Sequence, residues 1–253
     1  MSKTSARHQA LQEFLSARGY ATIEELARHF EVTPQTVRKD INALAEEGKV
    51  QRFHGGAGMV SGSENIVYDE RKGIRQDEKR RIGELLATHI PDGVSVCINI
   101  GTTTEEAARA LLEHKSLRVV TNSLNVASIC ARNPSFDVAV ACGTVRHRDN
   151  GIVGASAERF IREFRVDYGI IGISGIDEEG NLLDYDYREV AVARTIIECS
   201  RRVFLVTDSS KFGRPAMVRV AHLSDINALF TNAPLDSRWE DLIREAGVEL
   251  FMV

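Results

Sequence analysis

The chain has 253 residues, of which 43% are hydrophobic and 27% charged, and its formal net charge is -4. A chain of this length can bury a sizeable core, and it favours one medium domain with a smaller one. The charge excludes a protein that holds nucleic acid by bulk positive charge, because residues 1–60 carry eight Lys and Arg against seven Asp and Glu. Any affinity for DNA must come from locally placed cations and from several DNA-binding domains in one oligomer. This affinity should weaken steeply with salt.

Neither export nor metal chemistry is indicated by the chain. Residues 1–19 form a polar amphipathic stretch unlike a signal peptide, and no apolar run approaches the ~18 residues of a membrane span, so we expect a cytoplasmic protein. The seven histidines do not pair at metal-binding spacings, and we expect neither a metal nor a cofactor. The cysteines lack a CxxC pair and are expected to be buried neutral thiols; they are Cys97, Cys130, Cys142 and Cys199.

Two short helices joined by a tight turn are predicted near the N-terminus. Thr22 and Glu25 have the spacing of a capping box, in which each side chain satisfies a backbone N–H at the other position. Leu26 and Phe30 give this first helix an apolar face, and the chain then turns around Glu31. The sequence therefore predicts a capped helix that packs on one side.

The second helix is predicted to begin at Thr33, with Pro34 at the first position, where its missing N–H costs nothing. Val37, Ile41 and Leu44 recur on one side and predict the buried face. The opposite face carries donors and acceptors of the kinds that pair with base edges and phosphates in the major groove. Its residues are Gln35, Thr36, Arg38, Lys39 and Asn42.

A hairpin is predicted directly after this helix, which Gly48 can end. Val50–Phe53 has the pattern of a strand that turns at Gly55-Gly56, and such a hairpin is typical of a wing that contacts the DNA backbone. Capped helix pairs also occur in all-helical domains that bind nothing, but the hairpin and the polar face favour DNA binding. The candidate DNA-binding residues are Thr22, Thr33, Gln35, Thr36, Arg38, Lys39, Asn42, Arg52, His54 and Gly55.

A connector of small residues separates this region from the rest of the chain. It spans residues 57–64 and is followed by a charge-dense stretch, residues 69–84, that predicts a helix. We therefore expect a DNA-binding domain over residues 1–62 and a second domain over residues 63–253.

The second domain alternates short apolar strands with helical patterns, which predicts a mostly parallel, Rossmann-like sheet with helices on both faces. A last helix and strand follow Trp239. The predicted strands are Val94–Ile98, Arg118–Thr121, Asp137–Ala141, Asp167–Ile173, Val203–Thr207 and Ile226–Thr231.

The loops that follow these strands are the expected ligand site, because parallel sheets bind ligands at their carboxyl ends. Asn99–Thr104 places a glycine beside hydroxyl groups at the start of a helix, an arrangement that offers N–H and O–H donors to a phosphate. It is neither a Walker loop nor GxGxxG, and an ordinary capped turn between strand and helix is the alternative. Other polar loops end the neighbouring strands: Thr121-Asn122, Gly143 with Arg146 and Arg148, Ser174-Gly175, and Asp208–Lys211.

The N-terminal third resembles the winged helix-turn-helix of DeoR-type bacterial transcription regulators. The resemblance rests on a TPQTVRKD recognition helix at Thr33–Asp40 and an RxHGGA wing at Arg52–Ala57. Further segments resemble members of the same family along nearly the full length: Val119–Ser128, Gly172–Val190 and Asp208–Arg214.

This resemblance implies a repressor of glycerol metabolism genes with a sugar-phosphate-isomerase-like sensor domain. The implied partners are double-stranded operator DNA and a phosphorylated sugar or polyol, with glycerol 3-phosphate favoured, in a homo-oligomer, dimer or tetramer. Gly101, Thr102 and Thr103 would hold the phosphate and Lys211 would neutralise it, while the carboxylates of Asp184, Asp186 and Glu189 would face the hydroxyl groups. The candidate effector residues are Gly101, Thr102, Thr103, Asn122, Arg146, Ser174, Gly175, Asp184 and Lys211.

Two hypotheses of different classes follow. In the first, the chain is a ligand-responsive repressor without enzymatic activity, whose effector favours a state that binds DNA poorly. In the second, it is a sugar-phosphate isomerase with an accessory DNA-binding domain, in which Glu189 or Asp184 is the base and Lys211 the electrophilic partner. For Arg146, Arg148 and the acidic residues, a solvated loop or a subunit contact is an equal alternative to ligand binding. A recognition helix and wing favour the first hypothesis.

Overall fold

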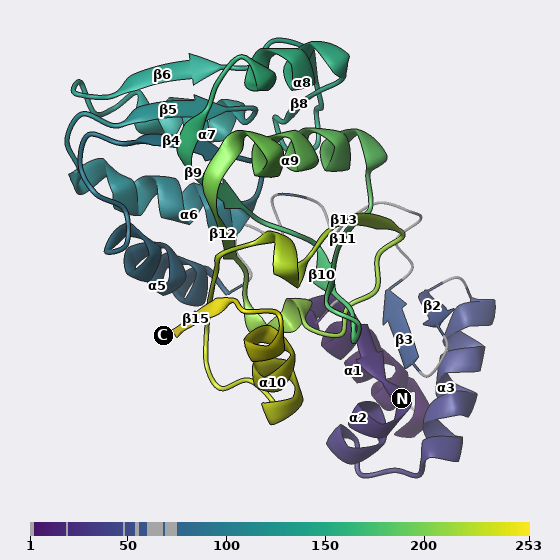
Figure 1. Ribbon diagram of the computed structural model, residues 1–253. Coiled ribbons are helices and arrows are strands. Elements are labelled where there is room, and N and C mark those ends of the chain that lie inside the picture. Colours follow the sequence, from purple (N-terminus) through teal and green to yellow (C-terminus); the bar gives the residue numbers. More distant parts are fainter. Residues whose placement is uncertain (1–2, 19, 48, 54–55, 60–67, 69–74) are drawn as a thin grey trace. The chain divides into compact units, whose positions relative to one another are not determined.

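The computed structural model describes residues 3–18, 20–47, 49–53, 56–59, 68 and 75–253 (Figure 1). The chain divides into two compact units, Met1–Val67 and Tyr68–Val253, which we describe separately. Within the described ranges, no helix is long and apolar enough to cross a membrane.

In its described residues, the first unit combines three helical segments with a small antiparallel sheet of order β1-β3-β2. Leu11 and Leu15 pack with Leu26, Ile41 and Leu44 in its core. The elements are α1 (Lys3–Arg18), β1 (Tyr20–Thr22), α2 (Ile23–His29), α3 (Pro34–Glu46), β2 (Val50–Phe53) and β3 (Gly56–Met59).

The predicted helix starts are confirmed. The Thr22 hydroxyl accepts a hydrogen bond from the Glu25 N–H at 3.1 Å, and the Glu25 carboxylate accepts one from the Thr22 N–H at 2.8 Å. The Thr33 hydroxyl accepts the N–H of Thr36 at 3.2 Å, with Pro34 at the first helical position. These caps fix where α2 and α3 begin, and so which side of α3 faces outward.

The second unit is built on a seven-stranded parallel sheet of order β15-β14-β12-β9-β4-β5-β6, which confirms the predicted α/β architecture. Each predicted strand has its counterpart, with ends shifted by no more than three residues. The strands are β4 (Ser95–Ile98), β5 (Arg118–Thr121), β6 (Asp137–Val140), β9 (Val166–Ile171), β12 (Ser200–Val206), β14 (Ala228–Thr231) and β15 (Glu249–Met252).

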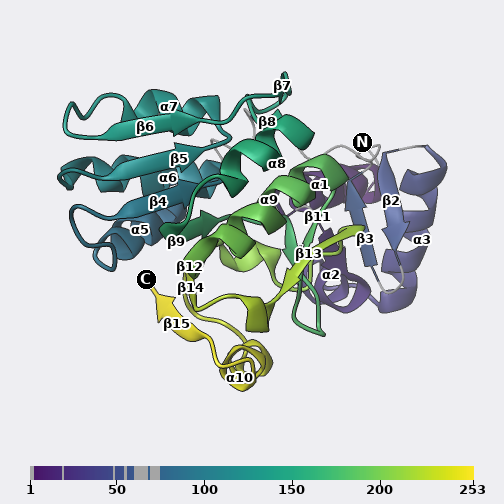
Figure 2. The same ribbon diagram turned by 45° about the horizontal axis from the view of Figure 1, so that its top comes forward.

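Helices cover both faces of this sheet, as Figure 2 shows. Successive strand residues point to opposite faces, and they divide accordingly: Val96 and Ile98 pack with α5, α6 and α7, whereas Cys97 packs with α8, α9 and α10. The helices are α5 (Gln76–Ala87), α6 (Thr102–Ala110), α7 (Leu124–Cys130), α8 (Ala155–Arg162), α9 (Tyr187–Cys199) and α10 (Ser237–Glu245).

Small accessory elements lie in the loops after the strands. β10 (Gly175–Ile176), β11 (Asn181–Asp184) and β13 (Val218–His222) form an antiparallel sheet, and β7 (Thr144–Val145) pairs with β8 (Ile152–Val153). Short 3-10 turns span Leu111–Glu113, Ser209–Lys211 and Leu223–Asp225. The turn at Ser209–Lys211 and the strands β7, β8, β10 and β11 belong to the loops that carry candidate effector residues.

Two sequence expectations were wrong. The charge-dense helix begins at Gln76 rather than within residues 69–74, which lie outside the described ranges, and it continues to Ala87 instead of ending at Glu84. Arg75 precedes it with a left-handed backbone (φ 53°), a conformation that cannot continue a helix. Cys142 is exposed, whereas the other three cysteines are buried as expected.

Candidate functional site

The candidate DNA-reading face is the exposed side of α3. Val37, Ile41 and Leu44 are buried, so the helix is fixed by one side only. The opposite side presents the predicted polar residues, with Thr36 half-buried beside its capping partner. The exposed members are Gln35, Arg38, Lys39 and Asn42.

An ion pair between a partly exposed arginine of α1 and a buried aspartate of α3, which the sequence did not reveal, holds α3 against α1. The Arg7 guanidinium donates to both oxygens of Asp40, at 2.6 and 3.0 Å, and His8 Nε2 lies 3.1 Å from the same carboxylate. Burial would raise the pKa of Asp40, but the hydrogen bonds from Arg7 and His8 outweigh it and lower the pKa. Asp40 therefore belongs to the buried side of α3 and positions the reading face.

The hairpin formed by β2 and β3 follows α3, and β2 lies beside this helix in Figure 1. Arg52 pairs with Ala57 across the hairpin and its side chain is exposed. Predicted sites at His54 and Gly55, and the helix end at Gly48, lie outside the described residues. An exposed cation on the hairpin and a polar helix face are the two parts that a winged helix-turn-helix brings to DNA.

The candidate effector site lies at the carboxyl ends of the sheet strands. β4 stands between β5 and β9, and the chain builds β5 and β6 on one side of it before crossing to β9 and β12 on the other. The strand order reverses between β4 and β9, which is where open α/β sheets bind ligands. Asn99, after β4, spans this point: its amide donates to the Gly172 carbonyl at 3.2 Å and accepts the Gly172 N–H at 3.0 Å.

Directly after Asn99, the first turn of α6 forms the candidate anion site. The Thr104 hydroxyl donates to the carbonyls of Asn99 and Gly101, at 3.0 and 2.8 Å, and shapes the turn. The side chains of Thr102 and Thr103 make no such bond within the described residues and are nearly buried. The first N–H groups of a helix lack intrahelical partners, so this turn offers both amide and hydroxyl donors to an anion.

The loop after β9 is fixed by close packing. The Ser174 hydroxyl donates to the Asp184 carboxylate at 3.1 Å, and that carboxylate also accepts the Tyr185 N–H at 2.6 Å. At Gly175, a Cβ would come within 2.0 Å of the Arg214 carbonyl oxygen. Glycine is therefore required here by backbone packing, whatever the loop binds.

Three buried acceptor or hydroxyl atoms at this edge have no hydrogen-bond partner among the described residues: Asn122 Oδ1, Thr207 Oγ1 and Thr231 Oγ1. The Asn122 amide N–H donates to the Ile152 carbonyl at 3.1 Å, which turns its oxygen away from that contact. Buried polar atoms are normally satisfied by protein, water or ligand. At these positions the carboxyl edge leaves hydrogen-bonding capacity that water or a polar ligand can satisfy.

The loop after β12 brings charged groups to the same edge. Asp208 is buried and accepts the Ser210 N–H at 3.0 Å, and Lys211 closes the following turn. Burial would raise the pKa of Asp208, but Lys211 and the hydrogen bond from Ser210 lower it. The Arg75 guanidinium lies 3.5 Å from the Asp208 carboxylate. Lys211 thus stands beside a carboxylate at the edge where the resemblance places the phosphate.

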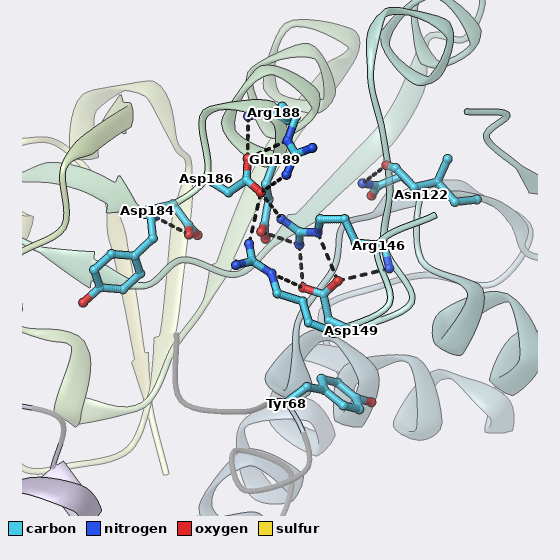
Figure 3. Close-up of polar contacts among 12 residues, drawn as sticks. Tyr68, Asn122, Arg146, Asp149, Asp184, Asp186, Arg188 and Glu189 are labelled. Atoms are coloured by element: carbon cyan, nitrogen blue, oxygen red, sulfur yellow. Dashed lines mark hydrogen bonds and ion pairs between the residues drawn. The ribbon is translucent and has the colours of Figure 1, made fainter. Parts of the chain in front are cut away.

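Arg146 is the centre of a buried charge cluster rather than an open cation (Figure 3). Its guanidinium contacts Asp149 at 2.5 Å, Glu189 at 2.6 Å and Asp186 at 3.0 Å. The Asp186 carboxylate also accepts hydrogen bonds from the other arginines of the cluster, Arg148 and Arg188, each at 3.1 Å. We call Arg146, Arg148, Asp149, Asp186, Arg188 and Glu189 the charge cluster.

The protonation of the charge cluster follows from burial opposed by ion pairing. Burial would lower the pKa of Arg146, but Glu189 and Asp149 outweigh it and raise the pKa. Burial would likewise raise the pKa of Asp186, which the hydrogen bonds from Arg188 and Arg146 lower instead. Burial and the neighbouring Asp184 carboxylate raise the pKa of Glu189 to about 7, because together they outweigh the lowering effect of Arg146.

Taken together, an exposed reading face on a winged helix-turn-helix and a polar edge on an α/β sheet define a DNA-binding regulator with a sensor unit. Residues 7–62 match the DeoR-like helix-turn-helix domain and residues 74–233 match the DeoR C terminal sensor domain. The chain belongs to the DeoR family of transcription regulators.

The chain is similar to named repressors over about nine tenths of its length. The glycerol-3-phosphate regulon repressor of Escherichia coli (strain K12) is 48% identical over 232 residues, which cover 92% of each chain. That of Haemophilus influenzae is 49% identical over 229 residues, 90% of this chain and 89% of the relative. The HTH-type transcriptional repressor CsqR of Escherichia coli (strain K12) is 42% identical over 239 residues, 93% of this chain and 92% of the relative.

The regulator hypothesis is confirmed over the isomerase alternative, since these relatives are named as repressors and this chain carries the DeoR-like helix-turn-helix domain. The Glu189 carboxylate, which the isomerase alternative would use as its base, contacts the Arg146 guanidinium at 2.6 Å. Asp184 is likewise engaged by Ser174 and Tyr185.

Proposed function

We propose that this repressor controls genes of glycerol or glycerol-3-phosphate metabolism and that a phosphorylated polyol, with glycerol 3-phosphate favoured, releases it from operator DNA. Residues 1–62 read the operator and residues 63–253 sense the effector, in the cytoplasm. The relatives that share 48–49% identity and carry the glycerol-3-phosphate name support this choice of effector.

The observation that carries the effector proposal is the first turn of α6 at the point where the strand order reverses. Thr102 and Thr103 bring hydroxyl groups to a helix N-terminus, and Lys211 brings a cation after a strand of the same sheet. A phosphate accepts hydrogen bonds from the turn and is balanced by the lysine. The Asn122 side-chain oxygen, which has no partner in the described part of the chain, is suited to accept an O–H of the polyol.

The proposed operator contacts come from Gln35, Arg38, Lys39 and Asn42 in the major groove and from Arg52 on the hairpin. The exposed face of α3 supports this assignment. Because residues 1–60 have nearly balanced charge, we propose that a dimer or tetramer supplies the remaining affinity by presenting several reading heads.

The effector proposal is tested by thermal unfolding and operator release with glycerol 3-phosphate, glycerol and inorganic phosphate as probes. We expect glycerol 3-phosphate to stabilise the protein, by about 2.7 kcal/mol at a hundredfold excess over its Kd, and to release the operator. Lys211→Ala is expected to lose both responses, while Lys115→Ala, at an exposed lysine outside the site, keeps them. Normal release by the Lys211 variant would contradict the assignment of this lysine.

A further inference from the structure

Glu105 is a buried carboxylate in the first turn of α6, next to the candidate anion site. It is 1% exposed, and its N–H donates to the Gly101 carbonyl at 3.0 Å, so it is part of the turn itself. The Tyr68 hydroxyl lies 2.7 Å from both oxygens of its carboxylate and donates to them. The first residue of the sensor unit is thus bonded directly to the turn that would hold the effector.

Asn125 extends this contact toward the charge cluster. Its side-chain amide donates to Glu105 Oε1 at 3.0 Å, to the Tyr68 hydroxyl at 2.9 Å and to the Asp149 carbonyl at 3.2 Å. The Asp149 carboxylate in turn pairs with Arg146. Figure 3 shows Tyr68 beside the Asp149 loop. Tyr68 therefore belongs to one continuous polar network that includes the first turn of α6 and the charge cluster.

The next described residue after Tyr68 is also attached to an effector loop. Arg75 donates to the Ser209 hydroxyl at 3.3 Å and lies 3.5 Å from the Asp208 carboxylate. It does so with φ at 53°, a conformation that is uncommon for residues other than glycine and is kept where surrounding contacts enforce it. Tyr68 is therefore held by the first turn of α6, which follows β4, and Arg75 is held by the loop after β12.

We infer that Tyr68 is a positioning residue that transmits effector occupancy at the first turn of α6 to the segment leading from the DNA-binding unit. Glu105 belongs to the turn that would hold the anion, so its carboxylate would repel an anion bound there, because like charges at short range repel. Its binding and the Tyr68–Glu105 hydrogen bond are therefore coupled, and coupling between two sites is reciprocal. The inference rests on the proposed effector site, but not on the identity of the effector.

Reciprocity gives a test that uses no effector. We compare hydrogen exchange at the amides of residues 105–108 in the full-length protein, with and without a DNA duplex selected by the wild type from a random-sequence pool. DNA is expected to change exchange at these amides in the wild type and to leave them unchanged in Tyr68→Phe, which keeps the ring and removes the hydroxyl. Tyr185→Phe is the matched control, because its hydroxyl donates to the Pro215 carbonyl at 3.0 Å, away from this network.

A second measurement uses glycerol 3-phosphate as the probe and records operator Kd with and without it. In Tyr68→Phe and in Glu105→Gln, which keeps the shape of the side chain, we expect the ratio of the two Kd values to fall by about tenfold, while the thermal shift with the probe persists. Unchanged ratios in both variants, or a DNA-dependent exchange change that survives Tyr68→Phe, would overturn the inference. A wild type that ignores glycerol 3-phosphate would contradict only the proposed effector, because the exchange measurement does not involve it.

Discussion

The reading face of α3 and the carboxyl edge of the sensor sheet are two polar sites built in opposite ways. On α3, Gln35, Arg38 and Asn42 are exposed, and the apolar side of one helix decides their direction. At the sheet edge, Arg146, Asp149 and Glu189 are buried and contact one another. The first site is available to a large partner, whereas most charge at the second is already paired. The comparison teaches that burial, rather than position near a site, distinguishes charges that hold the fold together from charges that are presented to solvent.

The largest expected effect comes from removing the buried cation at the sheet edge. Arg146→Met leaves three carboxylates of the charge cluster without their common cation, and loss of one partner of a buried ion pair costs about 3–5 kcal/mol. We expect this loss in the free energy of unfolding, followed by fluorescence of Trp239, the chain's single tryptophan, in urea. Arg148→Met is the control, since its partly exposed side chain contacts the same Asp186 and should cost about 1 kcal/mol or less. Equal losses would show that burial does not distinguish the two arginines.

A smaller effect is expected from removing an exposed cation of α3. Arg38→Ala removes a base or phosphate contact, which is expected to weaken operator binding by about 1–3 kcal/mol while leaving urea unfolding unchanged. Gel-shift titration at several salt concentrations sharpens the assignment, because a lost phosphate contact reduces the slope of log K against log salt by about 1. Arg159→Ala, at an exposed arginine of α8, serves as control. Normal operator affinity of the Arg38 variant would exclude it as a reading residue.

The smallest effect concerns the pH dependence of the sensor unit. The pKa of Glu189 is raised to about 7 in the folded protein, so the folded state binds more protons than the unfolded state from about pH 4.5 to 7. Stability should therefore fall as pH rises through this window, by on the order of 1 kcal/mol, and Glu189→Gln should abolish that fall.

Urea unfolding from pH 5 to pH 8 measures this difference and avoids the carboxylates with lowered pKa, such as Asp186, which lose their stabilising contribution only at lower pH. Glu198→Gln, at an exposed position of the same helix, should retain the wild-type pH dependence. A Glu189 variant whose stability still declines over this range would show that another group is responsible.

Local sequence patterns were sufficient to predict features that depend on a single helix or strand. Thr22 and Thr33 predicted the starts of α2 and α3, and the 3- and 4-residue spacing of apolar side chains predicted which face of α3 is exposed. Alternating strand and helix patterns predicted the parallel sheet and its polar edge. These features depend on hydrogen bonds and periodicities within a few residues, and the sequence displays them directly.

Long-range partners were not predictable in this way. Nothing near Asp40 indicates that Arg7 and His8 bind it, because α1 lies more than thirty residues earlier in the chain. Tyr68 belongs to no sequence motif, and its hydrogen bond to Glu105 joins residues that are 37 positions apart. Thr207 and Thr231 follow or end strands, and that their hydroxyls have no partner among the described residues becomes visible only when neighbouring strands are aligned.

The sequence by itself determined the family-specific helix-turn-helix, the direction of its reading face and the order of elements in the sensor unit, because caps and hydrophobic periods act locally. Only the tertiary structure decided which charges are already paired, and it placed Arg146 inside a cluster and Tyr68 against Glu105. The physical reason is that ion pairing and burial depend on groups brought together across 33 to 43 residues of chain, and no local pattern encodes such a distance.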